Sequence, residues 1–120
     1  MARFLSIEWV DALDAAAATL TVDDQTSLCV EYVVDRFAYH VTYAAGRVHF
    51  HNGAAPVPTV RLVVDRDTGA AVARGALSAQ RAFMNGLLRI EGDTLALADA
   101  LPALRLLGDT FAAVRASTEW

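Results

Sequence analysis

The sequence contains no lysine. It has ten arginines and fourteen acidic residues. The absence of lysine excludes a Schiff-base lysine and a P-loop for phosphates. A net charge of −4 without clustered basic residues argues against a nucleic-acid partner. A single cysteine, Cys29, excludes an intramolecular disulfide and a zinc site built from cysteines.

Long uninterrupted hydrophobic runs are also missing. Acidic residues at Glu8 and Asp11 interrupt the N-terminal segment, so no signal peptide is expected. The most apolar stretch, residues 94–114, contains Asp99 and Arg105, which suits a buried or amphipathic helix rather than a membrane span. The sequence therefore predicts a cytoplasmic protein with no integral membrane association.

Apolar residues nevertheless make up 55% of the 120 residues. This length predicts one domain, residues 1–120, large enough to bury a core. Much of the excess is alanine, a good helix former that adds little bulk. The bulky apolar residues gather in one strand face and in the last helices, more than a compact core strictly needs.

The first two thirds of the sequence predict a helix followed by strands. Ser6 is a good N-cap for a helix that runs to about Leu20. Alternation with a period of two then begins, and it predicts strands over residues 28–34, 37–44, 48–50 and 60–65. The pattern is typical of an antiparallel meander covered on one face. The apolar positions on that face are Leu28, Val30, Tyr32, Val34, Phe37, Tyr39, Val41, Tyr43, Val48, Phe50, Val60, Leu62 and Val64.

The last third returns to helices, which makes the fold class α+β. Asp67 and Ser78 are expected to cap two short helices that end near Gly75 and Gly86. A strand around residues 88–90 follows, closed by a turn in which Asp93 caps the next helix. That long helix is expected to kink or break at Pro102.

Residues 75–93, GALSAQRAFMNGLLRIEGD, resemble the signature of the sterol carrier protein 2 family. Every fixed position of the pattern G-x-L-x-x-x-x-A-F-M-x-G-x-L-x-I-x-G-D is present, and the likeness extends over about residues 27–107. The resemblance, closest to a bacterial stand-alone member, implies a five-stranded, mostly antiparallel sheet. It further implies helices covering one face of the sheet and an apolar tunnel between the layers.

The resemblance implies binding of a hydrophobic small molecule, such as a sterol, a fatty acid or a fatty acyl-CoA-like lipid, with no cofactor and no catalytic residues. Phe83 and Met84 are expected to face inward, where the adaptable Met side chain would suit varied ligands. The candidate ligand-binding residues are Tyr32, Tyr39, Tyr43, Phe83, Met84, Leu88, Leu97, Leu101, Leu104, Leu107 and Phe111.

The three tyrosines admit three interpretations. They are core aromatics with satisfied hydroxyls, polar anchors for a ligand hydroxyl or carboxyl, or general acids in an enzyme. An enzyme built on the same cavity, an isomerase, cyclase or hydrolase acting on a steroid- or polyketide-like substrate, is thus an alternative. A third alternative is an accessory domain that dimerises or binds a larger enzyme through the other sheet face, which carries Cys29, Val33 and Val63. A homodimer is left open.

Two further features bear on function. His40, His49 and His51 lie on the polar face of their strands, so they are expected to face solvent and to bind no metal. The last residues lack an S-K-L-type peroxisomal signal, and the basic character that helps animal family members meet anionic membranes is missing. Ligand binding is therefore a firmer expectation than transfer between membranes.

Overall fold

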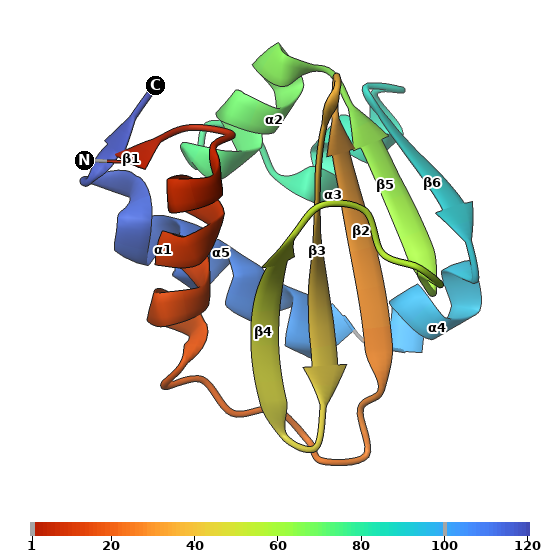
Figure 1. The fold of residues 1–120 in the computed structure, drawn as a ribbon. Helices are drawn as coiled ribbons and strands as arrows, with labels where there is room; N and C mark the ends of the chain where they lie inside the picture. The colour runs from red at the N-terminus through yellow and green to blue at the C-terminus, as the bar shows by residue number, and fades with distance from the viewer. Residues whose placement is uncertain (1, 100) are drawn as a thin grey trace.

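In the computed structural model, the helices lie on one side of a sheet and along one of its edges, and the other side of the sheet is its outer face (Figure 1). The structure describes residues 2–99 and 101–120, with the side chains of all of these except residues 101–104, 106 and 107. The sheet strands are β2 (Leu28–Val34), β3 (Phe37–Ala44), β4 (Arg47–Asn52), β5 (Val60–Val64) and β6 (Leu88–Gly92). The helices are α1 (Ile7–Ala17), α2 (Arg66–Ala73), α3 (Ala79–Met84), α4 (Thr94–Asp99) and α5 (Leu101–Arg115).

The five-stranded sheet is mixed, with the order β4-β3-β2-β5-β6. β2, β3 and β4 form the predicted antiparallel meander, and β5 and β6 are also antiparallel. The continuation of that meander into β5 was the wrong prediction, because β5 pairs in parallel with β2. The chain after β4 crosses the outer face of the sheet and enters β5 on the far side of β2 (Figure 1). A sheet that is mostly, but not entirely, antiparallel results.

The core forms between the inner face of the sheet and the helices. The predicted inner-face positions of β3, β4 and β5 are buried except Phe37 and Val64, which are partly buried. Against them α1 buries Trp9, Val10, Leu13 and Ala17. Trp9 connects the two layers, since its ring meets Tyr39 edge-on at 5.5 Å and stacks on Phe111 at 6.1 Å. Edge-on and stacked contacts at these distances are favourable geometries for aromatic rings.

Three helices begin directly after an N-capping residue, and one of these N-caps differs from the prediction. Ser6 and Ser78 cap α1 and α3 as predicted, each side chain accepting a bond from a first-turn N–H. Asp65, not the predicted Asp67, caps α2, and its carboxylate accepts the Thr68 N–H at 2.7 Å. The reason is that β5 ends at Val64, so Asp65 is the last extended residue before the helix. α1 ends at Ala17, three residues earlier than predicted.

The predicted kink or break at Pro102 falls beside residue 100, which lies outside the described residues, so it stays a prediction. Helix is described from Thr94 to Asp99 (α4) and from Leu101 to Arg115 (α5), and Pro102 lies within α5. Asp93 caps α4 as predicted by accepting the Ala96 N–H at 3.0 Å.

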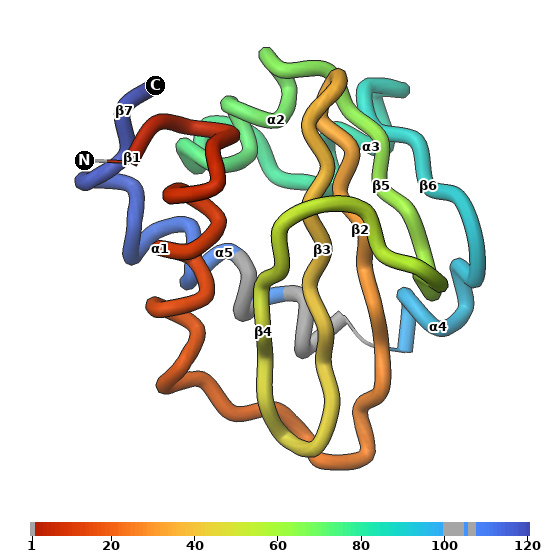
Figure 2. The backbone as a smooth tube through the Cα atoms, viewed as in Figure 1, coloured from red at the N-terminus to blue at the C-terminus, as the bar shows by residue number. Residues whose placement is uncertain are grey.

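The chain ends form a small parallel pair that the sequence did not indicate. β1 (Ala2–Arg3) pairs with β7 (Thr118–Glu119), which brings the two termini side by side (Figure 2). Aromatic contacts hold this pair to the core, since the Phe4 ring lies 5.0 Å from Trp120 and 4.9 Å from Trp9. Such short strands carry no periodicity, so they arise from tertiary contacts alone.

Candidate functional site

Three tyrosines gather on the inner face of the sheet. Tyr32 of β2 and Tyr39 of β3 are register partners, and their rings stack at 5.0 Å with an interplanar angle of 11°. Tyr43 points to the same face because it lies four residues further along β3. Tyr39 and Tyr43 are buried, and Tyr32 is partly buried. We call these three residues the tyrosine cluster.

Burial raises the pKa of every phenol in the tyrosine cluster. For Tyr32, the neighbouring Tyr43 and Tyr39 raise the pKa further, and Tyr43 does the same for Tyr39. For Tyr43, burial alone raises the pKa. The three phenols lie on one buried sheet face, where water is largely excluded. They remain protonated at neutral pH, so each hydroxyl keeps a proton with which it can donate a hydrogen bond.

Two polar atoms in this core have no hydrogen-bond partner among the described residues. They are the Tyr43 hydroxyl and the Trp9 Nε1, on side chains that are each 1% exposed. A buried polar group without a partner costs about 1–3 kcal/mol, so native proteins seldom leave one. For Tyr43, the described residues therefore do not supply the hydrogen-bond partner that the interpretation as a satisfied core aromatic requires.

The remaining candidate residues divide into three groups. Leu88, Leu97 and Phe111 are buried in the same core as Tyr39 and Tyr43. Phe83 and Met84 are 52% and 75% exposed, so the prediction that they face inward was wrong. The physical reason is that the short helix α3 buries only Ala82. Three further candidates, Leu101, Leu104 and Leu107, have side chains outside the described residues.

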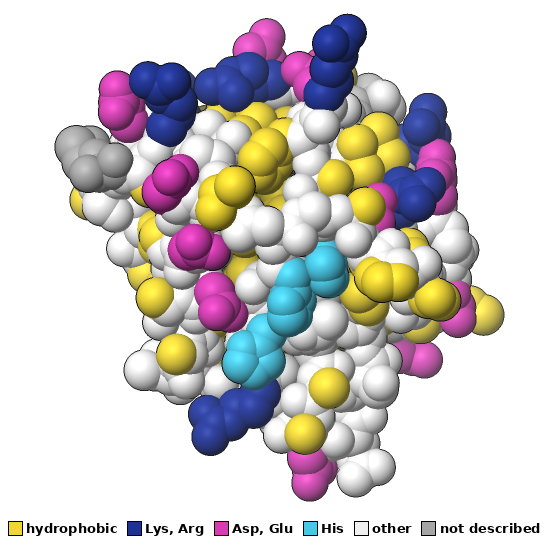
Figure 3. All heavy atoms as spheres, viewed as in Figure 1, with side chains coloured by type: hydrophobic (Ala, Val, Ile, Leu, Met, Phe, Trp, Pro, Cys, Tyr) yellow, Lys and Arg dark blue, Asp and Glu magenta, His cyan; other side chains and the backbone are white. Residues whose placement is uncertain are grey.

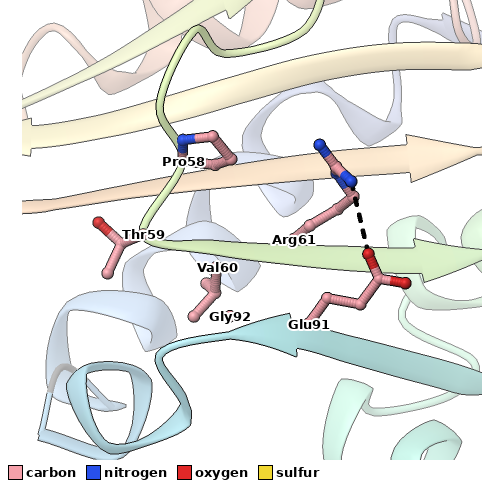
Figure 4. Close-up of a pocket in the computed structure, with 6 residues that line it drawn as sticks. All are labelled: Pro58, Thr59, Val60, Arg61, Glu91 and Gly92. Atoms are coloured by element: carbon pink, nitrogen blue, oxygen red, sulfur yellow. Dashed lines mark hydrogen bonds and ion pairs between the residues drawn. The ribbon is translucent and has the colours of Figure 1, made fainter.

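Two shallow pockets lie on the outside of the molecule. One, of about 180 Å³, lies between β5 and β6, where Arg61 contacts Glu91 (Figure 4). The other, of about 340 Å³, is lined mainly by Val63, Leu87 and the residues beside them. Neither pocket is lined by a candidate ligand-binding residue. The apolar tunnel between sheet and helices therefore stays a prediction.

The polar outer face carries the three histidines in one stripe, as predicted (Figure 3). The rings of His40 and His51 stack at 4.8 Å, and His49 Nδ1 lies 3.5 Å from the Asp14 carboxylate. Burial and the neighbouring His40 lower the pKa of His51. Among the residues that the structure describes, no group of three or more His, Cys, Asp or Glu side chains is placed to hold a metal ion.

A buried acid on the outer face was not singled out from the sequence. Glu31 is 2% exposed, although it alternates with apolar positions on the face that the sequence assigns to solvent. Its carboxylate accepts the Ala55 N–H and the Arg61 Nε–H, each at 2.8 Å. The chain segment after β4 covers it, and no local sequence signal indicates that crossing. Cys29 lies on the same face, and burial raises the pKa of its thiol, which suits an unreactive side chain.

The profile of the SCP-2 sterol transfer family matches residues 10–104, which is most of the chain. The chain belongs to the SCP-2 sterol transfer family. The match includes the strands of the sheet, the tyrosine cluster and the signature around α3 and β6. The family resemblance read from residues 75–93 is confirmed.

Solved structures of SCP-2 proteins share the fold. The crystal structure of a sterol carrier protein 2 has a TM-score of 0.71 at 18% identity, with 90% of this chain and 96% of that chain covered. Palmitated sterol carrier protein 2-like 2 of Aedes aegypti has a TM-score of 0.59 at 18% identity, with 88% and 94% covered. A conserved hypothetical protein of Thermus thermophilus has a TM-score of 0.54 at 23% identity, with 89% and 78% covered.

The same fold also occurs inside a larger enzyme. A double mutant of a secondary-alkyl sulfatase has a TM-score of 0.55 at 17% identity, with 65% of this chain covered. This SCP-2 chain spans only 13% of that enzyme's length. None of the curated proteins matches the sequence. Within the described residues, no helix is long and apolar enough to cross a membrane.

Proposed function

We propose that this SCP-2 protein binds one hydrophobic small molecule, a sterol, fatty acid or fatty acyl-CoA-like lipid, between the inner sheet face and the helices. Binding is non-covalent. The observation that carries the proposal is the buried Tyr43 hydroxyl, which has no hydrogen-bond partner among the described residues of an otherwise apolar core. A ligand with one polar end and an apolar body supplies that partner and takes the apolar contacts of the core.

The hydrophobic effect supplies enough free energy for such binding. Burial of about 400 Å² of apolar ligand surface releases about 10 kcal/mol, before the free-energy costs of association and ordering are subtracted. Association and ordering costs leave a dissociation constant on the order of micromolar to nanomolar. Buried Leu88, Leu97 and Phe111 supply apolar surface on the core side.

The protonated tyrosine cluster supports a carrier rather than an enzyme. Because burial raises the pKa values of these phenols, they donate hydrogen bonds to a ligand hydroxyl or carboxylate but hold their protons too tightly to act well as general acids near neutral pH. The family's sulfatase relative contains this fold as a small part, so its chemistry carries no argument for this chain.

Phe83 and Met84 have a different role in this proposal. They are exposed at the C-terminal end of α3, immediately after the buried Ala82. We assign them to the entrance, where they contact the ligand as it enters. Flexible Met and flat Phe side chains suit an entrance that admits apolar molecules of varied shape.

Native mass spectrometry of the purified protein tests the proposal directly. The expected result is a mass increase from a co-purified lipid, or saturable binding of a fluorescent fatty acid or a fluorescent sterol at about 10 µM. Protein without any adduct that also binds neither probe would overturn the proposal.

Two substitutions locate the site. Tyr43→Phe is expected to weaken binding of a fatty acid about fivefold to tenfold through the lost hydrogen bond. The matched control is Thr42→Ala, the preceding residue of β3, whose side chain points to the outer face and contacts His51. Equal weakening by both substitutions would place the ligand elsewhere.

A further inference from the structure

β6 is an edge strand, and no described strand pairs with its outer side. Figure 1 shows β6 at the border of the sheet, and within the described residues only β5 pairs with it. Asp93 N–H donates to the Thr59 carbonyl, and Asp35 N–H donates to the Val64 carbonyl. Since the N–H and C=O groups of alternate residues point to opposite neighbours, the odd-numbered residues of β5 face β6.

Alternate residues of β6 have backbone groups that do not pair with β5. Arg61 pairs with Glu91, and Val63 pairs with Arg89, through backbone hydrogen bonds inside the sheet. The N–H and C=O groups of Leu88, Ile90 and Gly92 therefore point away from β5, toward the free edge. They form a row of donors and acceptors centred on Ile90.

The opposite edge of the sheet, formed by β4, is covered, unlike the β6 edge. α1 packs along β4, and the Asp14 carboxylate accepts the Phe50 N–H at 3.0 Å. Asp11 accepts a bond from the Asn52 side chain at 3.1 Å. Unpaired edges invite pairing with another strand, and natural sheets commonly cover or block them.

We propose that two copies of this chain pair through β6, antiparallel about a twofold axis at Ile90, to form one continuous sheet. Each Ile90 then exchanges two backbone hydrogen bonds with Ile90 of the second copy. Leu88 exchanges another two with Gly92 of the second copy, and the symmetric pair does the same. A twofold contact of this kind uses the same surface on both copies.

The charges on β6 are complementary to themselves under this symmetry. Arg89 and Glu91 flank Ile90 on the outer face, so each Arg89 lies directly opposite Glu91 of the second copy. Their side chains are 70% and 40% exposed, and within one chain they form an ion pair at 2.9 Å, to which the second copy adds the opposite charges of its own pair. The two residues form a non-hydrogen-bonded pair across the new interface, where cross-strand side chains come closest and opposite charges stabilise pairing.

Exposed leucines lie just beyond both ends of β6. Leu87 is 47% exposed before the strand and Leu95 is 78% exposed after it. Antiparallel pairing brings Leu87 of one copy to the same end of the interface as Leu95 of the other. Isolated exposed leucines need no explanation, but two that flank a free edge add apolar area where a second copy would meet it.

Charge reversal at the edge tests the proposal. We expect sedimentation equilibrium over about 1–200 µM to show a monomer–dimer equilibrium for the unaltered chain. Arg89→Glu places like charges opposite each other twice per dimer, so it should weaken dimerisation about tenfold. Arg47→Glu is the matched control on β4, with the same change in charge, and it should leave dimerisation unchanged.

The double variant Arg89→Glu with Glu91→Arg recreates complementary pairs and should restore most of the lost affinity. A chain that is monomeric throughout the range would overturn the proposal, as would equal weakening by Arg89→Glu and Arg47→Glu. A chain that associates with another protein but not with itself would likewise overturn the proposal. The single reversal and its control decide the question if the double variant fails to fold.

A disulfide gives a second, independent measurement. Residues in a hydrogen-bonded antiparallel pair have Cα atoms about 5.5 Å apart, within reach of a disulfide. In a Cys29→Ser background, Ile90→Cys should form a covalent dimer on oxidation, whereas His49→Cys on β4 should not. Equal cross-linking of the two variants would contradict pairing through β6. None of these outcomes depends on whether a lipid binds.

Discussion

The carboxylate of Glu31 accepts the Ala55 N–H at 2.8 Å, on the outer face of the sheet. Its second oxygen accepts the Arg61 Nε–H, also at 2.8 Å. One buried side chain of β2 thus joins the crossing segment after β4 to β5, the strand that follows this segment. That crossing is what places β5 beside β2 and makes the sheet mixed.

Glu31→Ala should lower the free energy of unfolding by about 2–3 kcal/mol, because it leaves a buried N–H and an arginine without their acceptor. Glu91→Ala removes the more exposed carboxylate that also contacts Arg61, and it should change the free energy by less than about 0.5 kcal/mol. Urea denaturation measures both. Equal losses would mean that the buried contact with Ala55 has no special role.

Tyr43→Phe should leave the ligand-free protein as stable as before, or more stable by up to about 1 kcal/mol. The substitution removes a buried hydroxyl that has no partner among the described residues, so the folded state loses no hydrogen bond. Thr118→Val is the contrasting case, because the Thr118 hydroxyl is buried and donates to the Val114 carbonyl at 2.7 Å. That substitution should cost about 1 kcal/mol. Thermal and urea unfolding of lipid-free protein distinguish the two, and a clear loss in Tyr43→Phe would show that its hydroxyl has a partner.

Much of the fold could be predicted because its signals are local. The period-two alternation located β2, β3, β4 and β5, and Ser6 and Ser78 marked the helix starts. The pairing of β5 with β2 could not be predicted, since alternation fixes which face a side chain occupies but not which strand lies alongside. Two strands separated by a loop remain free to pair on either side of the meander.

The candidate site shows the same division between local and tertiary information. Alternation placed Tyr39 and Tyr43 correctly on the inner face. The signature gave the identities of Phe83 and Met84 but not their orientation, because a six-residue helix has too little periodicity to show which side packs inward. Glu31 was missed since its burial depends on a segment more than twenty residues away, at Ala55.

Stability should fall as the pH decreases through the region where histidine titrates. Burial, His40 and His49 lower the pKa of His51, while Asp14 opposes them. Since the pKa is lower in the folded state, the unfolded chain binds the proton more readily, so the free energy of unfolding decreases as the pH falls below about 6.5. His51→Gln should flatten this dependence, as measured by urea denaturation between about pH 5 and 8. An unchanged slope would show that His51 does not contribute to it.

Gly92→Ala should be among the most destabilising single-methyl additions. Gly92 has a φ of +104°, and a Cβ there would lie 2.5 Å from the Thr59 carbonyl oxygen, too close without movement of the β5 backbone. Gly53→Ala isolates the backbone contribution, because Gly53 has a φ of +86° and nothing within 4 Å of the added atom. We expect the free energy of unfolding to fall by about 1 kcal/mol for Gly53→Ala, from backbone conformation alone. For Gly92→Ala we expect a fall of about 3 kcal/mol, because the clash adds to the conformational cost.

Chemical denaturation of the two variants compares these losses directly. Equal losses would mean that the signature glycine is needed only for its backbone angle, and a larger loss at Gly92 would show that β5 and the turn into α4 require the close approach itself.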